Sequence, residues 1–173
     1  MEQPIIGYKI ILRKPCVEDA AFFANWYSKP EIMFDCAIMQ PATFETELEI
    51  IQNPIEDRDC FTITDINGRT VGETALLRIN RNRFCAEMSM IIPTPEDRRK
   101  GYGTEAAHLM LGRAFHHHNM NRIAITVVEE NIKAIKYWES IGFIKEGIQE
   151  QGYYFNGEYR NFVMMRILKH EYI

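Results

Sequence analysis

A short loop rich in glycine and cations lies between a strand pattern and a helix pattern, and no other segment constrains the chain as much. Two glycines two positions apart allow the backbone to approach a ligand closely. The helix that starts at once offers free N–H groups and the positive end of its dipole. With three cations in front of them, these groups predict a pyrophosphate site. The loop consists of Arg98, Arg99, Lys100, Gly101, Tyr102, Gly103 and Thr104.

Two other nucleotide-binding motifs fit this loop less well. The P-loop motif G-x-x-x-x-G-K-[ST] is absent. Residues 101–106 match the dinucleotide motif G-x-G-x-x-[GA], but that motif should follow its strand directly and be answered by an acidic residue about 20 positions later. Here residues 93–100 intervene, and position 121 is Asn. A dinucleotide-binding protein remains an alternative, as does a solvated helix start whose glycines serve only the turn.

Hydrophobic periodicity along the chain predicts a mixed α/β domain around one sheet. Asn67-Gly68 and Asn156-Gly157 are typical hairpin turns between strands. Asn131 is well placed as a helix N-cap, and Gly142 as the residue that ends the same helix. The expected strands are residues 8–13, 60–64, 70–79, 84–92, 123–128, 143–148 and 162–168, and the expected helices are residues 17–27, 43–51, 104–117 and 131–141.

Length and composition exclude several classes of protein. A chain of 173 residues suits a single domain over residues 1–173. Its formal net charge of −4 argues against a nucleic-acid-binding surface. We see no signal peptide and no stretch near the roughly 18 apolar residues of a membrane span. The cysteines at positions 16, 36, 60 and 85 form no CxxC pair and favour reduced thiols, so we expect a cytoplasmic protein without nucleic-acid or membrane partners.

Three consecutive histidines, His116 to His118, raise the question of a metal. Consecutive residues on one helix point in different directions, whereas zinc needs converging ligands. Because no cysteine or carboxylate cluster accompanies them in the sequence, we predict no metal site.

Two motifs in the second half of the chain resemble those of the GNAT acyltransferases. Arg98-x-x-Gly101-x-Gly103 is similar to the family motif [QR]-x-x-G-x-[GA]. Residues 131–143, which read NIKAIKYWESIGF, resemble the second motif, N-x-x-[AS]-x-x-x-[YL]-x-x-x-G-F. The opening residues 12–20 and the tail residues 155–161 resemble the branch that contains ribosomal-protein and spermidine N-acetyltransferases. The chain is therefore identified as similar to this family along its whole length.

The resemblance implies a GNAT-like fold of the α/β (α+β mixed) class, with a twisted and mostly antiparallel sheet flanked by helices. Such a sheet splays open between the strands ending near Ile92 and Val128, and the gap admits the pantetheine arm of acetyl-CoA. The amides of residues 99–104 would hold the pyrophosphate, and Asn131 would contact the arm beside Ala134. Asn131 as a plain N-cap and residues 90–92 as plain core strand are the structural alternatives. Besides the loop, the implied cofactor-binding residues are Met90, Ile91, Ile92, Asn131, Ala134 and Trp138.

Acetyl transfer to an amine needs a base, because a lysine-like amine is protonated at pH 7. Glu87 is the candidate, since Ala86-Glu87-Met88 resembles an Ala-Glu-Ile segment of the ribosomal-protein branch. It would act directly or through a water molecule. The alternative is a surface carboxylate or a salt bridge. The oxyanion would be stabilised by a backbone N–H of residues 89–91.

At the position of the acid that protonates the departing thiolate, the chain departs from the family motif. Many family members carry Tyr seven residues after the Asn, but here that position is Trp138, and Tyr137 lies one residue earlier. One residue corresponds to about 100° around a helix, so the two side chains are not equivalent. An indole N–H donates a hydrogen bond but does not release its proton. Tyr137 and water are the candidates for the acid.

The acceptor is a primary amine of unspecified identity, such as a polyamine or a peptide or protein N-terminus. Carboxylates outnumber cations between Glu31 and Asp59, and an acidic rim would attract a cationic amine, although a solvated helix face is the simpler interpretation. A homodimer is allowed. The alternative function is a catalytically inactive acyl-CoA-binding sensor on the same fold. The intervening charged residues are Asp35, Glu45, Glu47, Glu49, Glu56, Asp57 and Arg58.

Overall fold

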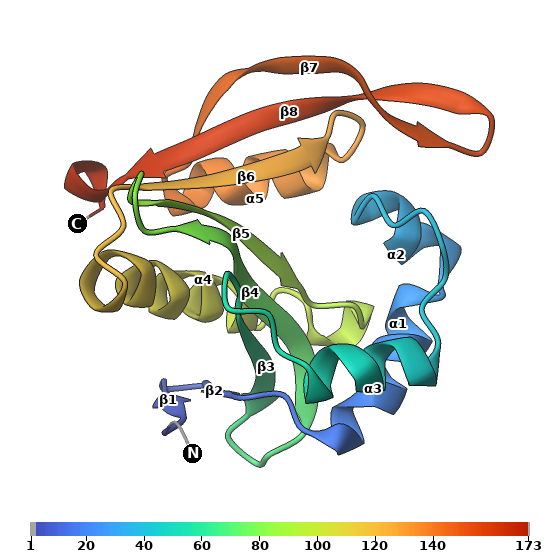
Figure 1. The fold of residues 1–173 in the computed structure, drawn as a ribbon, viewed down its shortest axis with the longest axis vertical. Helices are drawn as coiled ribbons and strands as arrows, with labels where there is room; N and C mark the ends of the chain where they lie inside the picture. Colours follow the sequence, from blue (N-terminus) through green and yellow to red (C-terminus); the bar gives the residue numbers. More distant parts are fainter. Residues whose placement is uncertain (1–2, 173) are drawn as a thin grey trace.

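An eight-stranded sheet runs through the computed structural model, which describes residues 3–172 (Figure 1). Its strands lie in the order β1-β2-β3-β4-β5-β6-β8-β7. Neighbours pair in antiparallel fashion except β5 and β6, which are parallel. The strands are β1 (Ile5–Ile6), β2 (Ile10–Arg13), β3 (Asp59–Asp65), β4 (Thr70–Asn80), β5 (Cys85–Ile91), β6 (Arg122–Val128), β7 (Ile144–Phe155) and β8 (Glu158–Leu168).

The helices lie in two groups on opposite sides of the central strands (Figure 1). One group is α1 (Ala20–Tyr27), α2 (Pro30–Asp35) and α3 (Phe44–Gln52). The other is α4 (Tyr102–Gly112), which continues as a π-helical turn (Arg113–His117), and α5 (Ile132–Ile141). Short 3-10 turns cover Val17–Asp19, Pro95–Asp97 and Lys169–Glu171.

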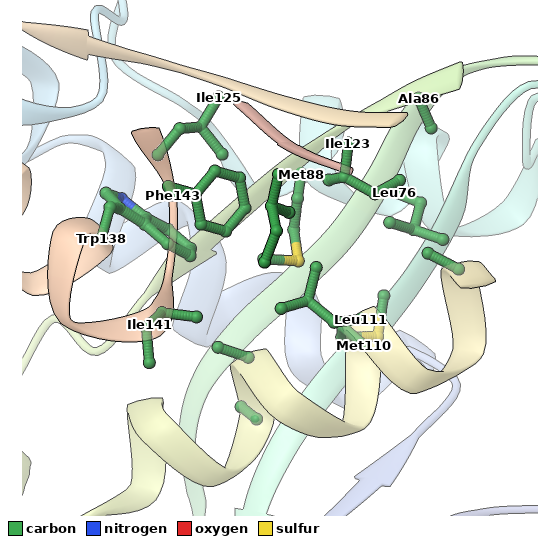
Figure 2. Packing of buried hydrophobic residues seen from close by; sticks show 14 of the residues in the cluster. Leu76, Ala86, Met88, Met110, Leu111, Ile123, Ile125, Trp138, Ile141 and Phe143 are labelled. Carbon is green, nitrogen blue, oxygen red and sulfur yellow. The ribbon is translucent and has the colours of Figure 1, made fainter. Parts of the chain in front are cut away.

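The main core lies between the sheet and the second group of helices (Figure 2). Helix α4 buries Ala106, Ala107, Met110 and Leu111, which recur on one face at helical spacing. Figure 2 shows Met110 and Leu111 facing Met88 of β5 and Ile123 of β6. Each large apolar side chain that leaves water here contributes about 1.5–3 kcal/mol. This burial fixes the start of α4, and therefore the loop that precedes it, against β5.

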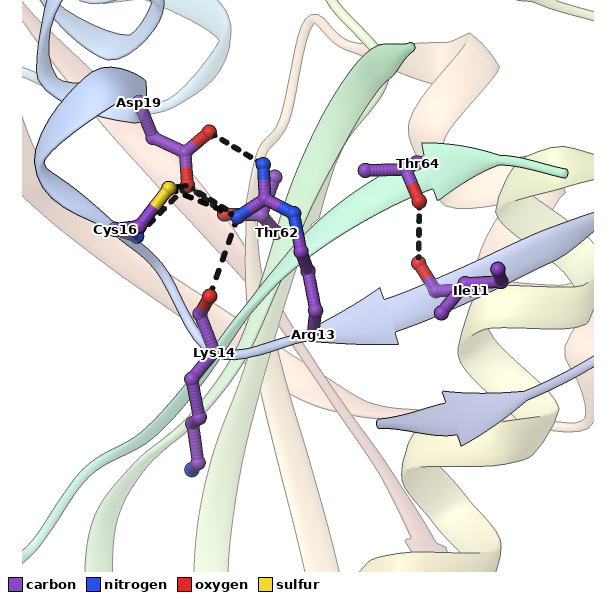
Figure 3. A network of polar contacts seen from close by, with 7 residues as sticks. All are labelled: Ile11, Arg13, Lys14, Cys16, Asp19, Thr62 and Thr64. Carbon is purple, nitrogen blue, oxygen red and sulfur yellow. Dashed lines mark hydrogen bonds and ion pairs between the residues drawn. The ribbon is translucent and has the colours of Figure 1, made fainter. Parts of the chain in front are cut away.

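A smaller apolar cluster holds the first group of helices on the other face of the sheet. Phe23 and Trp26 of α1 pack with Ile32 of α2, and Ile91 of β5 lies against them. A polar network sets where α1 begins (Figure 3). The Arg13 guanidinium donates to both carboxylate oxygens of buried Asp19, at 2.7 and 2.8 Å, and the Thr62 hydroxyl donates to the same carboxylate at 2.7 Å. Strands β2 and β3 thereby position α1 over the sheet.

Most predicted elements are confirmed, with corrections at short and polar segments. Strand β1 and helix α2 were not predicted, because two residues and six residues are too short to show a periodicity. Strands β7 and β8 extend beyond the predicted residues 143–148 and 162–168. Residues 144–152 are exposed throughout, so no alternation of buried and exposed positions marks β7. The helix predicted for residues 104–117 starts two residues earlier and changes to π geometry after Gly112.

The predicted splay of the sheet is confirmed at β5 and β6. These strands pair only through residues 85–87 of β5 and residues 122–124 of β6. Beyond that point residues 88–91 and 125–128 have no register with each other, and Figure 1 shows the two strands diverging. The gap opens toward the loop that precedes α4.

Candidate active site

The loop before α4 presents a run of unpaired backbone amides. Within residues 3–172, the N–H groups of residues 99–104 donate to no acceptor of the protein. Arg99 and Gly101 have positive φ angles of 63° and 88°. Such alternation turns successive N–H groups toward one concavity, which favours an anion. Gly101 is the N-cap of α4, so the positive end of the helix dipole faces the same place.

Asp97 fixes the loop on its strand side. Its buried carboxylate accepts two hydrogen bonds from the Arg69 guanidinium, at 2.7 and 2.8 Å, and one from Lys100 Nζ at 3.1 Å. These partners, Arg69 first, hold the pKa of Asp97 at about 2. Sequence reasoning missed Arg69 and Asp97, because they are 28 residues apart and no local pattern links them.

The three cations of the loop have different surroundings. The Arg98 guanidinium donates to the carbonyls of Ile92 and Pro93 at 2.9 and 3.0 Å, which favours a structural role over the predicted phosphate contact. Lys100 is bound to Asp97, and its ammonium lies 5.8 Å from the Tyr102 ring centre. Arg99 is exposed. An unpredicted cation, Lys9, donates from Nζ to the Lys100 carbonyl at 3.1 Å.

The residues of β5 beside the gap face two ways. Met90 and Ile92 are half-buried and pack toward α4 and α5, whereas Ile91 packs against α1 and α2. A Cβ built on Gly103 would lie 3.4 Å from the Met90 methyl and 3.6 Å from the Tyr137 hydroxyl. These are ordinary van der Waals distances, so Gly103 lies directly beside Met90 of β5 and the Tyr137 hydroxyl of α5.

Tyr137 and Trp138 of α5 occupy different environments. The Tyr137 hydroxyl lies 3.9 Å from Met90 Sδ, and burial raises the pKa of this phenol. Trp138 is 7% exposed, and its ring packs on Phe143 with centroids 5.1 Å apart (Figure 2). This burial in the core argues against the predicted cofactor contact by Trp138. The hydroxyl that faces the loop and β5 belongs to Tyr137.

Asn131 and Ala134 form the first turn of α5. Asn131 Oδ1 accepts a hydrogen bond from the Ala134 amide at 3.1 Å, so the N-cap predicted from the sequence is confirmed. A cofactor contact by Asn131 or Ala134 remains a prediction.

Glu87 lies on β5 at the last residue that pairs with β6. Its carboxylate forms an ion pair with Arg78 of β4, whose side chain is largely solvated, and the Glu87 side chain is itself about one third exposed. Glu87 lines neither of the cavities described below. This environment favours the salt-bridge alternative, and the role of Glu87 as a base remains a prediction.

Two adjoining cavities lie beneath α3 on the side of the sheet that carries α1 and α2. Their volumes are about 610 and 540 Å³. The second reaches Ser89, Met90 and Ile91 of β5, where the sheet splays. The residues shared by both cavities are Thr46, Glu47, Ile50, Arg58, Cys60 and Glu73.

The carboxylate of Glu73, which was not predicted as a site residue, lines both cavities. Glu73 of β4 lies opposite Ile91 of β5, and the Tyr27 hydroxyl donates to its Oε2 at 2.6 Å. Burial raises the pKa of Glu73 to about 7; the Tyr27 hydrogen bond lowers it, and the charges of Glu47 and Asp19 raise it. No sequence signal singled it out, because β4 reads TVGETALLRIN and contains other polar and charged residues besides Glu73.

The consecutive histidines lie at the end of the π-helical turn and line neither cavity. His118 Nε2 lies 2.6 Å from Asp59 Oδ2, and Arg113 and Lys14 pair with the same carboxylate. Within residues 3–172, no three His, Cys, Asp or Glu side chains are grouped to hold a metal ion. No helix in that part of the chain is long and apolar enough to cross a membrane.

The splayed sheet and its loop of free amides have the architecture of the GNAT acyltransferase class. Residues 9–144 match the family model described as acetyltransferase (GNAT) domain, and the chain belongs to this family.

Two spermidine N(1)-acetyltransferases and a solved structure are similar to this chain. Spermidine N(1)-acetyltransferase of Escherichia coli is 34% identical over 111 residues, which cover 64% of this chain and 59% of that protein, so the match spans less than two thirds of that relative. The Vibrio cholerae spermidine N(1)-acetyltransferase is 30% identical over 151 residues, covering 86% of this chain and 80% of that protein. A crystal structure of spermidine N-acetyltransferase from Vibrio cholerae, in complex with CoA and spermine, superposes with a TM-score of 0.87 at 27% identity, covering 95% of this chain and 98% of that one.

Proposed function

We propose that this chain transfers the acetyl group of acetyl-CoA to a primary amine. The observation that carries the proposal is the loop of unpaired amides at the open end of the splayed sheet. Backbone N–H groups at a helix start suit a pyrophosphate, and an unpaired strand edge suits an extended arm with amide groups. Membership of the acetyltransferase family supports the same ligand.

The cofactor residues follow from this geometry. The amides of residues 99–104 would hold the pyrophosphate, with the charges of Arg99 and Lys9 nearby. The backbone of residues 90–92 would pair with the pantetheine arm, because β6 does not pair with β5 beyond Glu87. Asn131 and Ala134, at the start of α5, would border the arm.

The Tyr137 hydroxyl would assist the departing thiolate. Its raised pKa keeps the phenol protonated, so it can donate a hydrogen bond to sulfur. An amide of residues 89–91 would stabilise the oxyanion. A thiol has a pKa of roughly 8.5, so its thiolate leaves without full protonation.

For the acceptor we propose a polyamine or another aliphatic amine with more than one positive charge. The cavities reach β5 at residues 89–91 and carry the carboxylates Glu47, Glu49 and Glu73 among mainly apolar walls. Methylene groups suit such walls, and ammonium groups suit the carboxylates. The spermidine acetyltransferases among the relatives support this class of amine.

A thiol-release assay tests the proposed function. Acetyl-CoA is offered with spermidine, spermine, a peptide with a free N-terminus and an aminoglycoside, and CoA release is followed. We expect release with at least one polyamine. Tight binding of acetyl-CoA without release in any reaction would favour the inactive sensor, and binding of NAD without binding of CoA would favour the dinucleotide-binding alternative.

A further inference from the structure

Glu73 is a carboxylate on β4 that lines the cavity, and the sequence did not connect it with the reaction. It alternates along β4 with Ala75 and Leu77, and all three side chains line the cavity that reaches β5. Directly opposite residues of paired strands present their side chains on one face, and Glu73 is opposite Ile91. Ser89, two residues before Ile91, lines the same cavity. Glu73 is thus beside the strand segment where the thioester is expected.

Tyr27 gives Glu73 a defined orientation. Its hydroxyl donates to Glu73 Oε2 at 2.6 Å across 46 residues of sequence. Helix α1, which carries Tyr27, is anchored by Phe23 and Trp26 and by the network around Asp19 (Figure 3). One carboxylate oxygen is therefore engaged by a fixed donor. The other, Oε1, forms no hydrogen bond within residues 3–172 and is available to a cavity ligand.

We propose that Glu73 is the general base of the acetyl transfer, which accepts a proton from the acceptor ammonium, and that Tyr27 is the residue that positions it. This inference rests on the proposed function. The burial of Glu73 supports this role as a base. A carboxyl with a pKa of about 7 takes a proton from an ammonium more readily than a solvated carboxyl does.

The proton and bond changes balance as follows. The acceptor R–NH3⁺ gives one proton to the Glu73 carboxylate and becomes R–NH2. The nitrogen lone pair attacks the thioester carbon, so that a C–N bond forms and the C–S bond breaks. The nitrogen loses its second proton as the thiolate gains one, and Glu73 returns its proton to solvent. The products are the acetamide and the free thiol, with one proton released.

Glu87 differs from Glu73 in both contacts and position. Glu87 is paired with Arg78 and is about one third exposed, so its carboxylate is already neutralised by a solvated partner. It lines neither cavity, whereas Glu73 lines both. A base needs hydrogen-bond reach to the proton that it removes, and of these two carboxylates only Glu73 lines the cavity that would hold the amine.

Several ionisable groups surround Glu73 and determine how its titration would appear. Glu47 of α3 and Asp19 before α1 oppose its ionisation, and Tyr27 stabilises the ionised form. Burial raises the pKa of the Cys36 thiol to about 12 and of the Cys60 thiol to about 11, so neither titrates near neutral pH. Arg58 also lines both cavities, and Lys14 and Glu49 line the first of them. If kcat/KM falls on the acidic side of a pKa near neutral pH, this acidic limb of the pH profile would therefore be assigned to Glu73. Glu47 is the competing group.

The test compares Glu73→Gln with wild type in the thiol-release assay with spermidine and spermine. Glutamine keeps an oxygen that accepts the Tyr27 hydrogen bond, so the fold is retained. We expect turnover to fall by about 10²- to 10⁴-fold. Calorimetric affinity for CoA should stay within about threefold of wild type, because Glu73 lies on the acceptor side. Glu150→Gln, an equal change on the exposed part of β7, serves as the matched control.

Two further variants separate a base from a structural carboxylate. Tyr27→Phe removes a hydrogen bond that stabilises the charged form, so the acidic limb of kcat/KM should move to higher pH. Glu47→Gln removes a neighbouring charge and should move the same limb to lower pH without abolishing turnover. Glu73→Asp should retain more turnover than Glu73→Gln.

The outcomes distinguish this inference from the proposed function. If wild type releases no thiol with any amine, the proposed function fails and the role of Glu73 fails with it. If wild type turns over and Glu73→Gln remains within about threefold of it, only the role of Glu73 is overturned. A limb that Tyr27→Phe leaves in place would likewise overturn the assignment of that limb to Glu73.

Discussion

The Tyr137 hydroxyl is a side-chain donor that the fold brings to the junction of β5, α5 and the loop. Tyr137→Phe removes this hydroxyl and changes the volume little. If the hydroxyl assists the thiolate, turnover should fall by about tenfold or more, while CoA affinity measured by calorimetry is kept. Tyr159→Phe, a change at an exposed position of β8, is the matched control. Unchanged turnover in Tyr137→Phe would leave water as the acid.

Gly101 adopts a backbone conformation that other residues rarely tolerate. Its φ is 88°, and Gly68 in the β3–β4 turn has nearly the same φ of 86° with nothing within 4 Å of a built Cβ. Gly101→Ala and Gly68→Ala should each lower the free energy of unfolding by about 1 kcal/mol. Only Gly101→Ala should weaken CoA binding, because only that change disturbs the amides of the loop. Equal CoA affinity in the two variants would place the pyrophosphate elsewhere.

The buried carboxylate of Asp97 links two segments. It lies before the loop that precedes α4 and accepts hydrogen bonds from Arg69 of the β3–β4 turn. Its pKa of about 2 lies below the unfolded value of about 3.9, so the carboxylate stabilises the fold above pH 4 and loses this effect as the pH falls toward 2. Asp97→Asn should lower the free energy of unfolding at pH 7 by about 1–3 kcal/mol, since charge-assisted hydrogen bonds to Arg69 are weakened.

Urea unfolding at pH 7, 4 and 3 measures this effect. The difference between wild type and Asp97→Asn should shrink as the pH falls below about 4, because the unfolded wild-type chain then binds a proton at Asp97 that the folded protein does not yet bind. CoA affinity should also fall in the variant at pH 7, since the loop is held less firmly. A stability difference that is independent of pH would show that the ion pair is not its cause.

Local patterns predicted elements well where one face is buried and poorly where none is. The helices α4 and α5 have apolar residues at helical spacing, and the sequence reading found both. Strand β7 is exposed over residues 144–152 and is held by its pairing with β8, so periodicity located only its beginning. Helix α2 buries only Ile32 and was missed.

The whole molecule is organised around one continuous sheet. The main core includes residues from Ile10 of β2 to Ile167 of β8, so the two ends of the chain stabilise the same structure. We therefore propose one domain over residues 1–173 and expect a single cooperative unfolding transition in calorimetry. Acetyl-CoA at about 100 times its Kd should stabilise the fold by about 2.7 kcal/mol and raise Tm. Two separate transitions, or a Tm that acetyl-CoA leaves unchanged, would contradict this.

The sequence by itself was sufficient for the family, the order of most elements and the phosphate loop. Each of these depends on residues within one segment: the spacing of Gly101 and Gly103, the N-cap at Asn131, and the apolar faces of α4 and α5. The tertiary structure alone decided which side chains meet. Register of β4 with β5 and the anchoring of α1 bring Glu73 to Tyr27 and to the cavity, while packing of α5 buries Trp138 and leaves Tyr137 at the gap. Such contacts join residues far apart in the chain, so no periodicity or motif within one segment contains them.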